Sequence, residues 1–257
     1  MKYWLETLAV AQRILTELVR RKRSLIVWSV FPISVLLLNG YILEGKAKIS
    51  IGSAMAQATP PTLIGAALFF SCMGGTLSTI VSEREQQTLK RLFLSPLSGL
   101  SYFFGIFIAH TVIGTAQTCL VYLVAFLYGA TFKGSIVGTV TILLLSVTSY
   151  VGIGFILGTQ IARRTEDVNA LVGSFGVPLL ILGGVFLPTA LFPKKLLDLA
   201  KYNPIYHMNE GLGLVWVKGK TLADIDIHFT FLWLFSCMTI LAGWLMYRQM
   251  LTLERRL

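Results

Sequence analysis

The sequence predicts an all-α polytopic membrane protein with six transmembrane helices. Three observations predict this class: hydrophobic residues make up 55% of the 257-residue chain, charged residues make up only 13%, and the charges are clustered. The clustering leaves six charge-free runs, which are residues 24–43, 49–82, 92–132, 134–162, 168–193 and 227–247. Each run is long enough for one span, because a helix crosses the hydrocarbon core with roughly 20 apolar residues. The remaining segments are too short for a soluble catalytic domain, so residues 1–257 are predicted to form a single transmembrane domain.

The formal net charge of +10 indicates topology rather than nucleic-acid binding, because the basic residues lie in short segments beside the apolar runs. With six spans and a cytoplasmic N-terminus, all 11 arginines fall on the cytoplasmic side and eight lysines fall on the outer side. This asymmetry follows the positive-inside rule. We therefore predict a multi-pass protein of the cell inner (plasma) membrane, with both termini in the cytoplasm.

Residues 1–23, which precede the first span, contain neither glycine nor proline. Apolar residues recur there at helical spacing, namely Trp4, Leu8, Ala11, Leu15 and Leu18. This pattern predicts an amphipathic helix. The helix either lies in the cytoplasmic membrane interface, with its basic tail against anionic lipid, or packs on a partner helix.

Residues 83–96, between the second and third runs, are predicted to form a short cytoplasmic helix. Ser82 and Glu85 have the spacing of a capping box, which would start a new helix there, and Pro96 would end it. Its apolar edge consists of Leu89, Leu92 and Phe93. A solvated loop has no need of such an edge, so this helix either lies on the membrane or docks into another protein.

The longest outer segment, residues 188–226, is too apolar for an ordinary solvated loop. Pro193 and Pro204 divide it into two short helical pieces that are rich in leucine and aromatic residues. Backbone outside a helix is tolerated at membrane depth only where it is buried against protein. We therefore expect this segment to lie at the outer membrane surface or to dip into it.

No Asp, Glu, Lys or Arg falls within any of the six runs, which disfavours an ion-coupled carrier. His110 and Gln117, both in the third run, are candidates for a substrate path, although hydrogen bonding between helices is the commoner role of such residues. The pairs Gly134 with Gly138 and Gly154 with Gly158 have the spacing of helix-packing contacts.

A near-match to a phosphate-binding loop occurs at the end of the first run. Gly40, Gly45 and Lys46 have the required spacing, but Ala47 stands where a serine or threonine is needed to bind magnesium. The chain also carries no motif of a membrane-embedded hydrolase or zinc enzyme. We therefore expect no catalytic, cofactor-binding or metal-ligating residue in this chain.

Several stretches together resemble one known family. They are the six spans with internal termini, the segment from Glu83-Arg84-Glu85 through Thr88-Leu89 to Pro96, and the segments 184–188 and 202–212. In these features the chain looks like the permease subunits of ABC-2 type exporters, over nearly its whole length. It is most similar to the daunorubicin-resistance-like drug efflux branch, with nodulation-factor and lipid-polysaccharide export permeases as relatives.

The resemblance implies that residues 83–96 are a coupling helix that docks on a separate ATPase subunit. Gln87 stands where the family usually has glycine in that helix. The implied ATPase-coupling residues in this segment are Glu83, Glu85, Thr88, Leu89, Arg91, Leu92 and Phe93. Arg163 and Arg164, in the short charged loop between the fourth and fifth runs, would form a second cytoplasmic contact with the ATPase, although such a loop is most often only a solvated topology signal. The resemblance also implies two permease subunits, identical or different, with two ABC ATPase subunits that hold ATP and Mg, and an outer re-entrant hairpin at residues 188–226.

The predicted function is that of a membrane-spanning permease subunit of an ATP-binding-cassette exporter. It would not be an enzyme itself; it would move a hydrophobic or amphipathic substrate, such as a drug, lipid or glycolipid, out of the cytoplasm or the inner leaflet. Its partners would be the ATPase, a second permease and membrane lipid, but no nucleic acid. A non-transporting membrane scaffold or assembly factor with the same fold is the alternative, and an ion-coupled carrier is the third.

Overall fold

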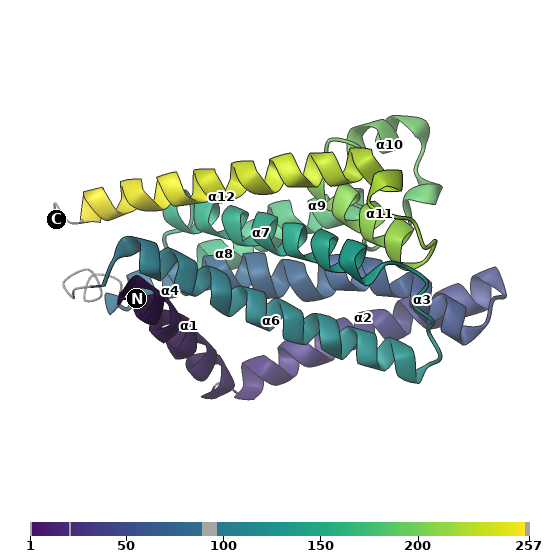
Figure 1. The fold of residues 1–257 in the computed structure, drawn as a ribbon, viewed down its shortest axis with the longest axis horizontal. Coiled ribbons are helices and arrows are strands. Elements are labelled where there is room, and N and C mark those ends of the chain that lie inside the picture. The colour runs from purple at the N-terminus through teal and green to yellow at the C-terminus, as the bar shows by residue number, and fades with distance from the viewer. Residues whose placement is uncertain (1, 21, 89–96, 255–257) are drawn as a thin grey trace.

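The protein is a bundle of helices in the computed structural model, which describes residues 2–20, 22–88 and 97–254 (Figure 1). Helices make up 85% of the structure, and no strand occurs in those residues. Six helices are long and apolar enough to cross a membrane: Leu25–Ala47, Ile51–Glu85, Gly99–Leu127, Ile136–Gln160, Thr165–Leu182 and Ala223–Thr252. The predicted fold class and the six predicted spans are confirmed.

Figure 1 shows the elements in chain order. They are α1 Lys2–Arg20, α2 Lys22–Ala47, α3 Ile51–Pro61, the π-helix η1 Thr62–Gly74, α4 Gly75–Glu85, α6 Gly99–Leu127, α7 Ile136–Gln160, α8 Thr165–Leu171, the π-turn η2 Val172–Gly176, α9 Val177–Leu182, the 3-10 turn η3 Thr189–Leu191, α10 Lys194–Ala200, α11 Pro204–Trp216, the 3-10 turn η4 Ala223–Ile225 and α12 Asp226–Glu254. Gly40, Gly45 and Lys46 lie within α2, so the near-match to a phosphate-binding loop is helical.

The second span, formed by α3, η1 and α4, lies at the centre of the bundle. In its most apolar stretch 78% of the residues are buried, against 17% in the first and fifth spans. Its middle part is a π-helix, which begins directly after Pro60 and Pro61. Because proline has no backbone N–H, two helical hydrogen bonds are missing there, and the backbone continues in wider turns.

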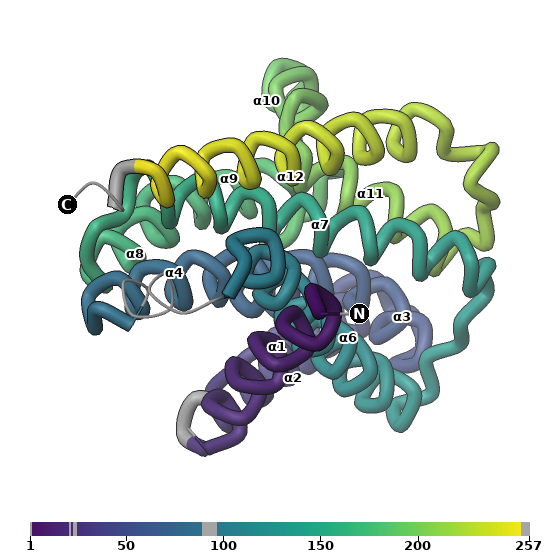
Figure 2. Tube along the Cα trace, turned by 60° about the vertical axis from the view of Figure 1, so that its left-hand side comes forward, coloured from purple at the N-terminus to yellow at the C-terminus, as the bar shows by residue number. Residues whose placement is uncertain are grey.

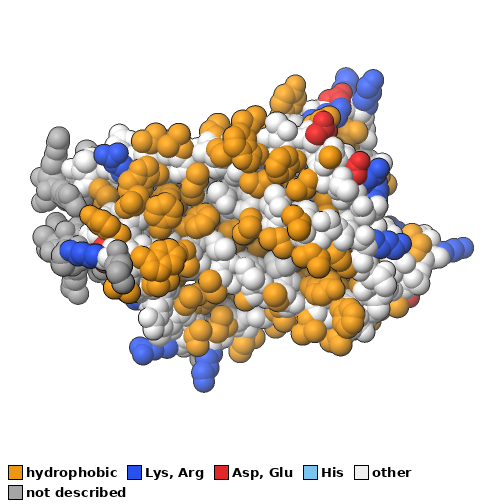
Figure 3. All heavy atoms as spheres, viewed as in Figure 1, with side chains coloured by type: hydrophobic (Ala, Val, Ile, Leu, Met, Phe, Trp, Pro, Cys, Tyr) orange, Lys and Arg blue, Asp and Glu red, His pale blue; other side chains and the backbone are white. Residues whose placement is uncertain are grey.

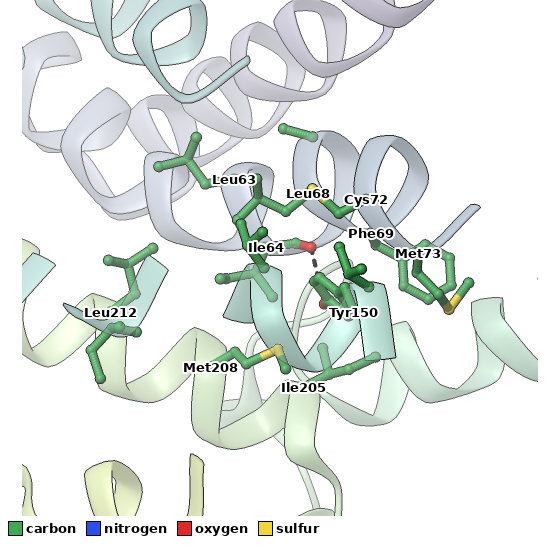
Figure 4. Close-up of a cluster of buried hydrophobic side chains, with 14 of the residues drawn as sticks. Leu63, Ile64, Leu68, Phe69, Cys72, Met73, Tyr150, Ile205, Met208 and Leu212 are labelled. Carbon is green, nitrogen blue, oxygen red and sulfur yellow. Dashed lines mark hydrogen bonds between the residues drawn. The ribbon is translucent and has the colours of Figure 1, made fainter. Parts of the chain in front are cut away.

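The core forms where η1 meets α7 and α11 (Figure 4). Leu63, Ile64 and Leu68 of η1 are fully buried, as are Met208 and Leu212 of α11. Tyr150 of α7 donates a hydrogen bond of 3.1 Å to the Ile64 carbonyl oxygen. A wider π-turn leaves carbonyl groups without the usual helical partner, and this hydroxyl supplies one such partner at membrane depth.

Three of the four glycines predicted in helix packing lie in helix–helix contacts, and Gly134, in the loop before α7, lies against α11. Gly134 and Gly138 face Val215 of α11, whereas Gly154 and Gly158 face the second span. A side chain at Gly154 would place its Cβ 2.9 Å from the Met73 carbonyl oxygen. Small residues let helix backbones approach closely, which is a main source of helix association in membranes.

A further close contact, which the sequence did not predict, joins α7 to α12. A Cβ atom at Gly152 would lie 2.7 Å from the Thr239 carbonyl carbon, and one at Gly243 would lie 3.0 Å from the Gly152 carbonyl oxygen. The two backbones therefore touch at this point. The fourth and sixth spans form one packed pair (Figure 2).

Helix α1 packs along α6, and the end of α1 and the start of α2 project together from the bundle (Figure 2). Its buried residues are Thr7, Val10, Ala11 and Ile14. Gly105 of α6 leaves room for this contact, because a Cβ there would lie 2.6 Å from Val10 Cβ. Helix α1 therefore packs on another helix, whereas Trp4 and Leu8 of the predicted stripe face outward. Its placement in the cytoplasmic membrane interface stays a prediction.

The two ends of the bundle differ in their basic residues. The start of α1, the end of α12, the end of α4 and the connection between α7 and α8 lie at one end (Figure 1). This arginine end carries Arg84, Arg163, Arg164 and Arg248, and the opposite lysine end carries Lys46, Lys133, Lys194 and Lys218. Hydrophobic side chains cover much of the surface between the ends (Figure 3). This is the surface of a multi-pass membrane protein.

At the lysine end, α10 and α11 occupy the segment expected to form an outer hairpin. Pro193 is the N-cap residue of α10, and Pro204 is the first residue of α11. Helix α11 is inserted in the bundle, with Leu212 fully buried. Helix α10 projects from it (Figure 1), and its Leu199 is 56% exposed.

Cysteine labelling tests this placement of the hairpin. A cysteine at Leu212 is expected to react slowly with a membrane-impermeant thiol reagent because the site is buried, whereas one at Lys220 reacts quickly because that side chain is exposed. A cysteine at Leu197, half-buried in α10, is expected to react slowly because lipid covers it. The measurement uses intact cells and a chain whose three native cysteines are replaced by alanine. Equally fast labelling at all three positions would rule out an embedded hairpin.

Candidate functional site

The end of α4 is held by a buried charge network at the arginine end. Both oxygens of the Glu83 carboxylate are engaged: Oε1 accepts a hydrogen bond from the Arg13 guanidinium of α1, and Oε2 accepts one of 2.6 Å from the Tyr102 hydroxyl of α6. The Glu83 side chain is only 8% exposed. A buried carboxylate is stable only when such partners satisfy it, and this one joins three helices.

The next two residues bind other helices. Arg84 donates a hydrogen bond of 3.0 Å to the Ala162 carbonyl oxygen, in the turn after α7, and contacts the Met250 sulfur of α12. Glu85 accepts hydrogen bonds from the Thr165 backbone N–H at 3.1 Å and from its hydroxyl. Thr165 begins α8. Three consecutive side chains therefore connect the end of α4 to α1, α6, α12, the start of α8 and the turn before α8.

The same end of the bundle is reinforced around the start of α6. Glu6 of α1 accepts hydrogen bonds from the Ser98 backbone N–H at 3.2 Å and from the Ser101 hydroxyl at 3.0 Å. Ser98 is also the N-cap residue of α6. A carboxylate next to the first turn of a helix stabilises it through the helix dipole, so α1 also fixes where α6 begins.

The predicted capping box at Ser82 is wrong. Helix α4 continues through Ser82 to Glu85, and the Ser82 hydroxyl donates a hydrogen bond to the Thr79 carbonyl within the same helix. The reason is packing, because Leu77 and Ile80 are fully buried and keep α4 helical. A new helix therefore does not begin at Glu83.

Helix α4 ends in a turn where Gln87 has a φ of +56°. This left-handed conformation follows many helices and favours glycine, because a Cβ atom is strained there. Glycine, which the resemblance implies at this position, would adopt it without strain. Gln87 therefore stands at a position whose geometry suits glycine.

The remaining coupling candidates are only partly described. Thr88 follows the turn, and Leu89, Arg91, Leu92 and Phe93 lie outside the described residues. Arg163 and Arg164 are exposed, and their backbone N–H groups both donate to the Asp167 carboxylate, at 2.8 and 2.9 Å. Asp167 thus holds the start of α8 and leaves the side chains of both arginines at the surface.

A cavity of about 360 Å³ lies beside the network, between α1, α2, α4 and α6. His110 lines it. Its Nδ1 lies 2.9 Å from the Ser71 carbonyl oxygen and therefore carries the proton, so that Nε2 accepts a hydrogen bond of 3.4 Å from the Thr79 hydroxyl. Gln117 lies farther along α6 and donates to the Trp28 carbonyl oxygen at 3.0 Å. Both residues thus connect helices, and His110 also reaches open space.

A second histidine pair, at the lysine end, was missed by the sequence analysis. His207 of α11 and His228 of α12 have their Nδ1 atoms 3.0 Å apart, and His207 Nε2 donates to the Lys201 carbonyl oxygen at 2.8 Å. Burial lowers the pKa of His207 below its usual value. In the neutral pair His228 donates and His207 accepts, which joins the hairpin helix to the sixth span. Within the described residues, no three metal-binding side chains come together.

Comparison with known proteins decides the family. The family model described as ABC-2 type transporter matches residues 6–215. The chain belongs to the ABC-2 type transporter family. This confirms the family resemblance, whereas the daunorubicin-resistance-like branch stays a prediction. The matched region includes most of α1, the Glu83-Arg84-Glu85 sequence and most of α11.

Two relatives of this chain are named as ABC transporters or their permeases. The chain is 27% identical over 186 residues to the probable multidrug ABC transporter permease YbhR of Escherichia coli, covering 71% of this chain and 49% of YbhR. It is 24% identical over 190 residues to ABC transporter G family member 20 of Dictyostelium discoideum, covering 73% of this chain and 25% of that protein. The chain thus spans about half the length of the first relative and a quarter of the second.

Proposed function

We propose that this chain is the membrane subunit of an ABC exporter, which moves a hydrophobic or amphipathic molecule out of the cytoplasm or inner leaflet. A separate ABC ATPase, in two copies, would bind ATP and Mg and supply the energy. The observation that carries the proposal is the contact set of Glu83, Arg84 and Glu85, in a chain that belongs to the ABC-2 family. A movement of the ATPase against the segment after Thr88 would therefore be transmitted to every helix that these three residues contact.

The segments that would meet the ATPase lie at the arginine end of the bundle. In this proposal the arginine end faces the cytoplasm, which agrees with the positive-inside rule, and residues 83–96 with Arg163 and Arg164 meet the ATPase. Glu85 and Thr165 connect these two surface segments directly. Movement of the ATPase against either segment would therefore shift α4 and α8 together, and α4 continues into the central second span.

A second permease subunit, identical or different, would pack against the fifth span. In that span only 17% of the residues are buried within one chain, although it is as apolar as a spanning helix requires. Phe175 is 68% exposed there. Two copies meeting along this span would enclose a path between the central helices, and alternating access would open the path to one side at a time.

Co-purification with the ATPase tests the proposal. Leu92→Asp is expected to weaken the contact by a few kcal/mol, roughly a hundredfold in affinity, because a charge replaces an apolar side chain of the proposed contact. The permease and its ATPase are co-expressed, purified in detergent and quantified, alongside export of a known cargo. Leu191→Asp, on an exposed leucine at the lysine end, is the matched control and is expected to leave co-purification unchanged.

One result would contradict the proposed role of residues 83–96 in ATPase binding. Unchanged co-purification and export with Leu89 and Leu92 both replaced by Asp would mean that this segment only lies on the membrane. The segment from Arg163 to Asp167 would then be the leading ATPase contact. Loss of all ATPase association in the wild type would favour the scaffold alternative.

A further inference from the structure

An apolar groove of about 420 Å³ lies at the lysine end, beside the end of the fifth span. It is lined by Pro178, Ile181 and Leu182 of α9 and by apolar side chains of residues 187–196. One of these, Leu191, is 72% exposed, so the groove opens at the surface. A groove lined by apolar side chains alone binds the apolar part of a molecule and offers no hydrogen bond to a polar part.

Helix α11 holds the shape of the groove. Gly184 follows α9 with a φ of +77°, a left-handed conformation that suits glycine at the end of a helix. Asn209 of α11 donates hydrogen bonds of 3.2 and 3.0 Å to the carbonyl oxygens of Gly183 and Gly184. The Thr189 hydroxyl donates to the Glu210 carboxylate of the same helix. The end of α9 and the lining segment after it are therefore both fixed to α11, which lowers the ordering cost of binding.

Two lysines without an ion-pair partner lie beside the groove. Lys194 and Lys195 stand between two of its lining residues in the chain, and both are exposed. No carboxylate of the described residues pairs with either of them, and the carboxylate of α10, on Asp198, pairs with Lys201 at 2.8 Å. Figure 3 shows basic side chains at this end of the molecule. A negatively charged group at the edge of the groove would therefore be attracted.

The charge of the lysine end favours a lipid over a second copy of this chain as the occupant. This end carries eight lysines against five carboxylates, which are Glu44, Asp198, Glu210, Asp224 and Asp226. A second copy side by side in the same membrane would place the same excess of positive charge at this depth. An anionic phospholipid carries the opposite charge, and its acyl chains begin next to its phosphate. It therefore matches both the lysines and the apolar groove.

We propose that this groove binds an acyl chain of an anionic phospholipid, whose phosphate group lies at Lys194 and Lys195. The lipid belongs to the leaflet at the lysine end, which is the outer leaflet in the proposed orientation. It fills the space between α9 and α10 and thereby connects α10, which projects from the bundle (Figure 1), to the fifth span. This binding goes beyond the proposed function, because it requires neither an ATPase nor transport.

Lipid binding to the full-length permease alone tests the proposal. The protein is delipidated in detergent and titrated with phosphatidylglycerol or phosphatidylethanolamine of identical acyl chains, and the bound lipids are counted by native mass spectrometry. The tightest site on each subunit is expected to bind phosphatidylglycerol about tenfold more tightly, because two partly screened contacts between lysine and the anionic lipid contribute. Equal affinities for the two lipids would overturn the head-group assignment.

A double variant tests the lysine pair. Lys194→Gln with Lys195→Gln is expected to remove the preference for phosphatidylglycerol. Lys218→Gln with Lys220→Gln changes another pair of exposed lysines at the same end, and it is the matched control that should keep the preference. Because all four side chains are exposed, neither double variant should disturb folding. A preference that survives the first double variant would overturn the assignment of the phosphate to Lys194 and Lys195.

A larger side chain tests the groove itself. Ile181→Trp fills part of the groove and is expected to weaken binding of both lipids at this site about tenfold or more. Leu179→Trp, on an exposed leucine of the same helix that does not line the groove, is the matched control and should leave binding unchanged. Full binding by Ile181→Trp protein that unfolds like the wild type would overturn the groove assignment.

A second copy of the chain in the groove would give a different result. Ile181→Trp would then shift the assembly from dimer to monomer in the same mass spectra and leave lipid binding unchanged. Because binding is measured without the ATPase, its failure leaves the proposed coupling function standing. Failure of the ATPase to co-purify leaves the lipid result standing.

Discussion

Replacing Glu83 with alanine is expected to lower the free energy of unfolding of the permease by about 2–4 kcal/mol. The change removes the acceptor for both Arg13 and Tyr102. Tyr102 is fully buried, so its hydroxyl is left unpaired in an apolar environment. Arg13 is 34% exposed, and water replaces part of its lost ion pair, which keeps the loss below that of a completely buried pair.

Glu85→Ala is the matched control, because it removes the same side chain two residues later. Its contacts with Thr165 are exposed, so the expected loss is below about 1 kcal/mol. The measurement is unfolding in mixed detergent micelles, followed by tryptophan fluorescence. The double variant with Arg13→Ala should lose less than the sum of the single variants, because the two residues share one interaction. Equal losses for Glu83→Ala and Glu85→Ala would show that burial of Glu83 contributes nothing.

The spans could be predicted because a membrane enforces a simple rule along the sequence. Charges are excluded from roughly 20 consecutive residues wherever a helix crosses, so the six charge-free runs mark the six helices directly. The π-helix from Thr62 to Gly74 could not be predicted in this way. All faces of this central segment are apolar, and hydrophobic periodicity therefore carries no information about the number of residues in each turn.

The sequence predicted which segment contains the candidate site, but it did not predict the contacts that the residues of this segment make. The sequence singled out Glu83 and Glu85 as polar residues at the end of a span, and local rules assigned them to the first turn of a new helix. Their partners Arg13, Tyr102 and Thr165 lie 70, 19 and 80 residues away in the chain. No local spacing rule relates residues so far apart, so the network became visible only in the folded protein.

Helix α1 illustrates the same limit on a smaller scale. Its period correctly predicted a helix, but Thr7, Val10 and Ile14, which face α6, were not in the predicted stripe. Trp4 and Leu8 form an apolar edge beside that face and are exposed. A helix that lies between protein and lipid has one apolar face toward each of them. A prediction that looks for a single apolar face finds only one of the two.

Gly152→Val is expected to prevent most of the protein from folding correctly, with a cost of more than about 3 kcal/mol, above the usual range for an overpacked site. The atoms that a side chain would strike are the carbonyl group of Thr239 and the backbone nitrogen of Ile240, at 2.7–2.9 Å. Backbone atoms cannot rotate away as a side chain does, so α7 and α12 would have to separate. Gly45→Val, in α2, is the matched control, because no atom lies within 4 Å of a Cβ there. Size-exclusion chromatography of fluorescently tagged variants in detergent measures the outcome: Gly45→Val is expected to elute as the wild type does, and Gly152→Val mainly as aggregate. A wild-type elution profile for Gly152→Val would mean that the fourth and sixth spans do not touch at their backbones.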